Sequence, residues 1–335
     1  PRVGFHKYTF PKNKPAQVVI DLEHRDSLLN YNIQINDGVS IQGIRYSNDW
    51  AKEQKIHFYM QFSEKITDTL FNNKKSILGI SFGKLNTPLL VKVGISAVSI
   101  DGAKANMQEE IPNWDFEKTK IKAQKLWKEA LLKIQVEGES ETQKEIFYTA
   151  LYHSLLNPNL YVDVDGMYNG TDLQKHYTDD THYTIFSLWD TFRATHPLFT
   201  LIEQKRTAEF IRTFLRQFKD GGQLPVWELA ANYTGCMIGY HCIPVITDAF
   251  VKGINDFDVE LALRAMIHSA TQDDLGLKSY KENGFISASE EPESVSKTLE
   301  YAYDDWCIAM FAKDLGKEDD YQYFLKRSGY WKNTY

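Results

Sequence analysis

The sequence has 335 residues, of which 43% are hydrophobic and 25% are charged, so it is long enough for two domains and ordinary in composition for a globular protein. A formal net charge of −7 provides no polybasic stripe for nucleic acid or an anionic membrane, and no run of about 18 apolar residues predicts a membrane-spanning helix. Three cysteines, Cys236, Cys242 and Cys307, exclude a disulfide framework and a four-thiolate zinc site.

Residues 1–112 predict an antiparallel β-sandwich that is incomplete at its N-terminus. Short apolar runs, several of them rich in aromatic residues, alternate with Gly, Asn and Asp. Strands are expected at residues 17–22, 39–46, 56–62 and 89–100. Because no helical segment alternates with these strands, a parallel α/β sheet is disfavoured. Residues 79–83 match the G-x-S-x-G nucleophile pattern, but strands surround them and no helix follows, so we assign no nucleophile there.

Residues 113–138 predict a linker helix, because large apolar side chains recur on one face of residues 114–136 among lysines and glutamates. Residues 139–335 predict a helical domain. Its first helix is expected to begin at Ser140, whose hydroxyl can cap it with Gln143 as the capping-box partner. Further helices are expected at residues 207–218, 239–252, 259–270, 294–315 and 319–327. Helices joined by long polar loops predict a toroid whose loops line one face.

Two sequence patterns point away from metal and nucleotide chemistry. The run from Asp163 to Gly166 resembles the start of a calcium loop but lacks its third acidic position and its terminal Glu, so a hairpin turn is predicted. The nine histidines form no H-E-x-x-H pair, and no glycine-rich phosphate loop opens a helix. Zinc-dependent hydrolysis and nucleotide binding are therefore disfavoured.

Two segments, residues 187–197 and 222–241, each place a tryptophan directly before a carboxylate: Trp189 before Asp190, and Trp227 before Glu228. An indole face can stack on the C–H surface of a pyranose, and a carboxylate accepts hydrogen bonds from its hydroxyls. The local pattern leaves alternatives open. Asp190 can cap a helix, both tryptophans can fill the core, Arg193 can simply pair with Asp190, and the nearby histidines can be structural.

These two segments carry a family resemblance. The blocks S-L-W-D-T-F-R-A-T-H-P-L and L-P-V-W-E-L-A-A-N-Y-T-G-C-M-I-G-Y-H resemble signature blocks of glycoside hydrolase family 92 α-mannosidases in order and separation. Supporting blocks lie at residues 2–5, 8–11, 248–253, 294–301 and 304–306. The resemblance implies a multidomain β + α fold, in which an N-terminal β-sandwich precedes an (α/α)6 barrel. Residues 139–335 would be the N-terminal part of that barrel.

The resemblance also implies an activity. Members of this family are exo-acting, calcium-dependent enzymes that remove terminal α-linked mannose from mannosides or N-glycans with inversion. By position within the matching blocks, the candidate substrate-binding residues are Trp189, Asp190, Arg193, Trp227, Glu228, Asn232 and His241. The general acid, the general base and most calcium ligands of the family come from blocks that do not occur before Tyr335, so no catalytic or metal-binding residue is assigned.

The resemblance therefore predicts that this segment alone is inactive, and that the protein is bacterial and secreted, periplasmic or exposed at the cell surface. Two other functions remain open at this point. One is cleavage of mannosyl phosphodiesters, where the leaving group needs little protonation. The other is mannose binding without catalysis.

Overall fold

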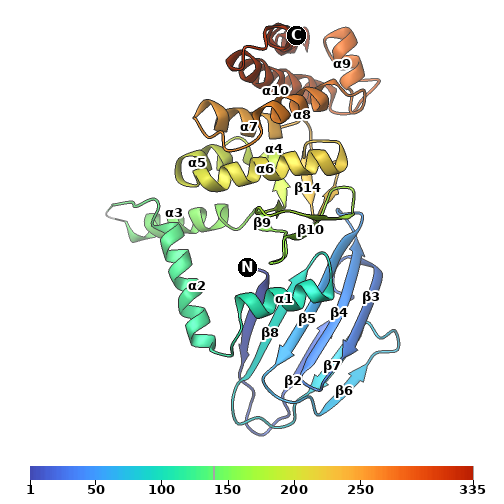
Figure 1. Cartoon of the computed structure of the whole chain (residues 1–335), viewed down its shortest axis with the longest axis vertical. Coiled ribbons are helices and arrows are strands. Elements are labelled where there is room, and N and C mark those ends of the chain that lie inside the picture. The colour runs from blue at the N-terminus through green and yellow to red at the C-terminus, as the bar shows by residue number, and fades with distance from the viewer. Residues whose placement is uncertain (139, 335) are drawn as a thin grey trace. The chain divides into compact units, whose positions relative to one another are not determined.

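The computed structural model describes residues 1–138 and 140–334, which form two compact units. The first contains residues 1–169 and 173–184, and the second contains residues 170–172 and 185–335. Figure 1 shows strands gathered in the N-terminal part of the chain and helices in the C-terminal part. The predicted order of an antiparallel β-domain followed by a helical domain is confirmed, whereas the expected boundaries at residues 112 and 138 stay predictions.

Two antiparallel sheets form the sandwich of the first unit. The five-stranded sheet has, in spatial order, β1 (Val3–Tyr8), β8 (Leu89–Ser96), β5 (Gln54–Phe62), β4 (Ser40–Asn48) and β3 (Ser27–Ile35). The three-stranded sheet has β2 (Gln17–Asp21), β7 (Ile77–Ser81) and β6 (Asp68–Phe71). Ile41 and Phe58 of the first sheet share one buried apolar cluster with Leu78 and Ile80 of the second. Ser81 thus ends a sandwich strand, which agrees with assigning it no nucleophilic role.

Helix α1 (Ile100–Glu110) was not predicted, and it corrects the expectation of a strand as far as residue 100, because β8 ends at Ser96. The helix packs on the five-stranded sheet through Ala103 and Met107, which contact Tyr59. Its Asn106 donates a hydrogen bond of 2.8 Å to the buried Asp163. Asp163 lies in a tight turn closed by its backbone N–H donating to Met167 O, so the prediction of a turn is confirmed.

The remaining elements of the first unit are two helices and four short strands. Their bounds are α2 (Phe116–Leu131), α3 (Glu141–Ser154), β9 (Asn159–Leu160), β10 (Met167–Asn169), β11 (Lys175–Tyr177) and β12 (Tyr183–Thr184). Ser140 caps α3 as expected, because its side chain accepts the backbone N–H of Gln143.

The second unit is mainly helical. Its helices are α4 (Leu188–Thr191), α5 (Thr195–Ile202), α6 (Gln204–Gly221), α7 (Cys242–Val251), α8 (Val259–Thr271), α9 (Leu277–Asn283), α10 (Ser294–Asp314), α11 (Glu318–Ser328) and the 3₁₀ helix η1 (Tyr330–Thr334). The helices expected from about residue 207 onward are confirmed within a few residues, while α4, α5 and α9 were not predicted. Within the described residues no helix is long and apolar enough to cross a membrane.

Helix α10 is the longest helix of those described in this unit and packs against α7, α8 and α11. One side of it is fully buried, where Phe311 contacts the Phe250 ring at 4.4 Å between centroids. A second stripe of large apolar side chains on α10 is open to solvent: Val295 (57% exposed), Leu299 (37%), Tyr303 (44%) and Trp306 (46%). Such exposed apolar helix surface is what a partial helical barrel predicts.

Candidate functional site

The two tryptophan–carboxylate segments meet in one small sheet. Strand β13 (Phe186–Ser187) pairs with β14 (Trp227–Leu229), which pairs with β15 (Asn232–Tyr233), all antiparallel. In this register Ser187 lies opposite Trp227, and Phe186 lies opposite Glu228. Segments about 40 residues apart in the sequence are therefore brought together by backbone pairing, which the sequence analysis did not predict.

Asp190 lies in the four-residue helix α4, which directly follows β13. It does not cap that helix. The N-cap is Ser187, which makes no capping bond with its side chain but donates its hydroxyl to the Asp190 carboxylate. Asp190 is exposed, and Trp189 beside it is partly buried with the guanidinium of Arg193 at 5.5 Å from its ring centroid. The helix-capping alternative for Asp190 thus finds no support in the geometry.

Glu228 is in a different environment, since only 1% of it is exposed. Its Oε2 accepts the backbone N–H of Ile185 at 3.1 Å, and its Oε1 accepts the backbone N–H of Ala231 at 2.6 Å. Both donors have left-handed backbone, with φ values of 69° and 65°. Left-handed φ is unfavourable for residues with a Cβ, above all for β-branched Ile. The buried carboxylate therefore stabilises two strained positions of the backbone.

Asn232 supports the same turn. The two residues between β14 and β15, Ala230 and Ala231, have φ of 49° and 65°, as a two-residue hairpin of type I′ requires. Asn232 is 5% exposed, and its side-chain amide donates to Ala230 O at 2.8 Å. Trp227 is partly buried, and its carbonyl accepts from the Thr234 hydroxyl at 2.8 Å. These contacts give Glu228 and Asn232 a defined role in local structure, while sugar contact by them stays a prediction.

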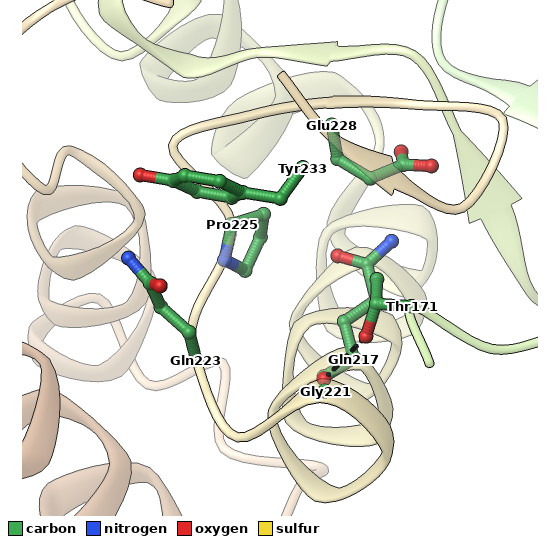
Figure 2. A pocket seen from close by; sticks show the side chains of 7 residues that line it. All are labelled: Thr171, Gln217, Gly221, Gln223, Pro225, Glu228 and Tyr233. Carbon is green, nitrogen blue, oxygen red and sulfur yellow. Dashed lines mark hydrogen bonds between the residues drawn. The ribbon is translucent and has the colours of Figure 1, made fainter. Parts of the chain in front are cut away.

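Glu228 also lines a small pocket of about 100 Å³. Figure 2 shows its seven lining residues: Thr171, Gln217, Gly221, Gln223, Pro225, Glu228 and Tyr233. Ligand pockets commonly measure about 300 Å³ or more, whereas one water occupies about 30 Å³. The pocket therefore has room for a few waters rather than for a sugar ring.

His241 and Arg193 belong to a line of charged groups of alternating sign. His241 Nδ1 lies 2.8 Å from Asp304 Oδ1, and its Nε2 lies 3.1 Å from Glu300 Oε2. The second contact has an ion-pair distance, although the N–H is not directed at the oxygen as a hydrogen bond requires. Glu300 Oε1 in turn pairs with Arg193 Nη2 at 3.0 Å. Two of the residues expected to bind substrate are thus joined through Glu300.

The charges of this group follow from its contacts. Burial alone would disfavour the His241 imidazolium, but Asp304 and then Glu300 outweigh it and raise its pKa to about 9. Burial likewise opposes ionisation of Glu300, yet contact with His241 and Arg193 holds its pKa below the usual value. Burial raises the pKa of Asp304, against which the His241 contact and the backbone N–H of Tyr240 act. His241 is therefore a cation at neutral pH.

Sequence reasoning did not single out Glu300 and Asp304, which appeared only within supporting blocks of the resemblance. Their spacing of four residues on one helix is a common sequence pattern and carries no functional signal by itself.

The arrangement of acidic side chains bears on the calcium ion that the resemblance implies. Among residues 1–138 and 140–334, no group of three or more His, Cys, Asp or Glu side chains is arranged to hold a metal ion.

Comparisons with known proteins agree with the resemblance. The glycosyl hydrolase family 92 N-terminal domain matches residues 1–96, and the family 92 catalytic domain matches residues 102–335. The family GH92 α-mannosidase BT3965 of Bacteroides thetaiotaomicron is 37% identical over 99% of this chain with a TM-score of 0.94, and its structure has also been solved with mannoimidazole. The inverting mannosidase BT2199 of the same organism is 29% identical with a TM-score of 0.90, also over 99% of this chain.

Among curated proteins, a secreted glycosidase of Arthroderma benhamiae that is described as uncharacterized is 28% identical over 270 residues. That match covers 74% of this chain and 30% of the fungal protein. The chain spans about half the length of the solved relatives, because it covers 48% of BT3965 and 48% of BT2199.

Proposed function

Because this chain belongs to glycosyl hydrolase family 92, we propose that it forms part of an exo-acting α-mannosidase that removes terminal α-linked mannose by hydrolysis with inversion. Support comes from BT3965, an α-mannosidase that has been solved with the mannose-like ligand mannoimidazole, and from BT2199, an inverting mannosidase. The substrates proposed are mannosides or N-glycans with an α-mannose at the non-reducing end. Secretion is part of the proposal, and the secreted fungal relative supports it.

The exposed Asp190 carboxylate beside Trp189 is the observation that carries this proposal. The hydroxyl of Ser187, the donor to Asp190, occupies one carboxylate oxygen, and the rest of the carboxylate faces solvent. Arg193, 54% exposed in its side chain, adds a donor three residues away. An acceptor, a donor and an indole ring on one short segment match the hydroxyls and the C–H face of a pyranose. Asp190 is therefore the residue that we assign to a mannose hydroxyl.

We propose that the proton-transfer groups lie outside these 335 residues. Inversion requires two carboxyl groups about 6.5 to 9.5 Å apart, one protonating the leaving oxygen and the other activating water. The buried carboxylates of the site, Glu228 and Asp304, are engaged by backbone N–H groups and by His241, and we assign them no catalytic step. Calcium, which would polarise sugar hydroxyls when bound, is likewise proposed to be held by ligands outside these residues.

The proposal is tested with a chimera in which residues 1–335 are followed by the part of BT3965 that this chain does not match. The chimera is incubated with α-linked mannobiosides and, as a matched control, with α-linked glucobiosides. Release of mannose that appears first as the β-anomer in proton NMR supports the proposal. Soluble, folded chimera that releases no mannose, or that releases glucose equally fast, contradicts it. Loss of mannose release on chelation and its return with added calcium would support the metal requirement.

A further inference from the structure

We propose that Glu300 is a positioning residue, which fixes the Arg193 guanidinium against the Trp189 ring by joining it to the buried His241–Asp304 pair. The inference rests on the proposed function, in which Arg193 and Trp189 meet the substrate. It adds a residue that neither the sequence pattern nor the resemblance assigned. The geometry that carries it lies entirely within the second unit.

The anchor of this arrangement is the buried ion pair of His241 and Asp304. His241 and Asp304 have no exposed side-chain surface, and Asp304 accepts the backbone N–H of Tyr240 at 2.8 Å through its second oxygen. The His241 ring stacks on Phe192 with centroids 4.0 Å apart and an interplanar angle of 12°. His241 is thus held by an ion pair, by its place before α7 and by an aromatic face, so it has little freedom to move.

Glu300 connects this anchor to the surface. It lies one helical turn before Asp304 on α10, so both carboxylates project from the same side of the helix. One oxygen faces His241 and the other faces Arg193, and the side chain is 20% exposed. From the surface inward, the charges of Arg193, Glu300, His241 and Asp304 alternate in sign and sum to zero. This neutrality reduces the free-energy cost of burying His241 and Asp304.

Arg193 is the outer member, and without this contact it would be a mobile surface side chain. Its guanidinium lies 4.6 Å from the Phe192 ring centroid and 5.5 Å from that of Trp189. Ion pairs between two mobile exposed side chains contribute little, because both lose rotamer freedom on pairing. Here one partner is already fixed by His241, so only Arg193 loses freedom. Glu300 therefore sets the orientation of the donor that we propose to meet the sugar.

The charged groups that face His241 determine its pKa, and this pKa can be measured to test the arrangement. They are Glu300 and Asp304 from α10 and, through Glu300, Arg193 from the segment after α4. If Glu300 supplies part of the field that keeps His241 charged, Glu300→Gln should lower the pKa of His241 from about 9 by more than about one pH unit. The same substitution should release Arg193, since an amide offers no charge to the guanidinium.

Both effects are measured by NMR on the 335-residue chain labelled at histidine and arginine. We expect the unsubstituted chain to hold His241 as an imidazolium up to about pH 9 and to show a slowly exchanging Arg193 Nη2–H, the atom that contacts Glu300. Glu300→Gln should lower that pKa and shift the Arg193 signal to the position of a free arginine. Glu260→Gln, which removes a carboxylate paired with Lys317 on the surface, is the matched control and should change neither.

Two results would overturn the inference: His241 titrating near pH 6.5 in the unsubstituted chain, or an Arg193 signal that Glu300→Gln leaves unchanged. If Glu300→Gln fails to fold, Glu300→Asp decides, because the shorter acid keeps a negative charge but cannot reach both partners. The Glu300→Asp variant should retain most of the raised pKa of His241 and still release Arg193. An ordered Arg193 in that variant would also overturn the inference.

A separate measurement distinguishes failure of the proposed function. Arg193→Gln in the chimera should raise KM for the mannobioside with a smaller change in kcat. An unchanged KM would remove Arg193 from substrate binding while leaving the positioning result intact.

Discussion

The Oε1 atom of Glu228 accepts the backbone N–H of Ala231 at 2.6 Å, and this carboxylate holds a turn that glycine would form without strain. Ala231 has φ of 65°, and Ala230 before it has φ of 49°. A residue with a Cβ is destabilised in this region by about 1 to 2 kcal/mol. The structure therefore contains a local conflict between backbone preference and side-chain chemistry, which Glu228 resolves.

Ala231→Gly is accordingly expected to stabilise the second unit by about 0.5 to 1 kcal/mol, because relief of the left-handed strain exceeds the loss of backbone entropy. The measurement is urea unfolding followed by circular dichroism. Ala123→Gly is the matched control, since Ala123 is exposed within helix α2, where the same change should destabilise by up to about 1 kcal/mol. A destabilising effect of Ala231→Gly would show that the turn is not strained.

His196 should limit stability in acid. It is 2% exposed among Phe199 and Phe210, and burial lowers its pKa to about 4. Since the unfolded chain takes up a proton near pH 6.5 and the folded chain only near 4, the stabilisation is present above pH 6.5 and is lost as pH falls toward 4. The loss should reach about 3 kcal/mol, at about 1.4 kcal/mol for each pH unit.

The check is the free energy of unfolding between pH 7 and pH 4 for the unsubstituted chain, for His196→Leu and for His268→Gln. His196→Leu should flatten the acid dependence, whereas His268→Gln, at an exposed position, should leave it in place. Equal acid dependence in all three proteins would exclude His196 as its source.

Arg327 should be among the residues least tolerant of substitution in the second unit. It is 1% exposed, donates to both oxygens of the fully buried Asp305 at 2.8 and 3.1 Å, and donates to Ala270 O at 2.9 Å. Burial already raises the pKa of Asp305 to about 6 with the arginine in place. Arg327→Met leaves that buried carboxyl without its cation, with only the Tyr240 and Tyr280 hydroxyls donating to it, and should cost about 3 to 5 kcal/mol.

Thermal melting measures this effect. The exposed Lys125 of α2, which pairs with Glu129, provides the contrast, and Lys125→Met should change stability by less than about 0.5 kcal/mol. Addition of Asp305→Asn to Arg327→Met should recover part of the loss, because it removes the unpaired acid. A melting temperature for Arg327→Met that matches that of Lys125→Met would contradict the account of this pair.

The elements that could be predicted are those whose hydrophobic pattern lies within one short segment of the sequence. Alternating apolar runs indicated the sandwich, and amphipathic periodicity indicated α6, α8, α10 and α11. Helix α1 was missed because Gly102 and Asn106 weaken a helical pattern, and both are explained by a distant partner: a Cβ on Gly102 would lie 2.2 Å from Asp163 Oδ2, and Asn106 bonds to the same carboxyl. Such tertiary constraints have no local signature.

The candidate site likewise combines features that the local sequence indicated with features that depend on distant contacts. The sequence singled out the two tryptophan–carboxylate segments by their shared composition, and the structure shows that they lie in one sheet. The difference between exposed Asp190 and buried Glu228 could not be predicted, because it depends on left-handed backbone at Ile185, where the sequence has no glycine to mark it. Glu300 was missed for a related reason, since its partners Arg193 and His241 lie far from it in sequence.

Asp190→Ala in the chimera with BT3965 tests the central claim most directly, with kcat/KM for an α-mannobioside as the measured quantity. Loss of a charge-assisted hydrogen bond to a mannose hydroxyl should lower kcat/KM by about 10- to 100-fold. The melting temperature should stay within about 2 °C, because Asp190 is exposed and does not cap α4. Asp256→Ala, which removes an exposed aspartate paired with Arg212, should leave kcat/KM unchanged. An Asp190→Ala chimera as active as the Asp256→Ala chimera would contradict the assignment of Asp190 to mannose binding.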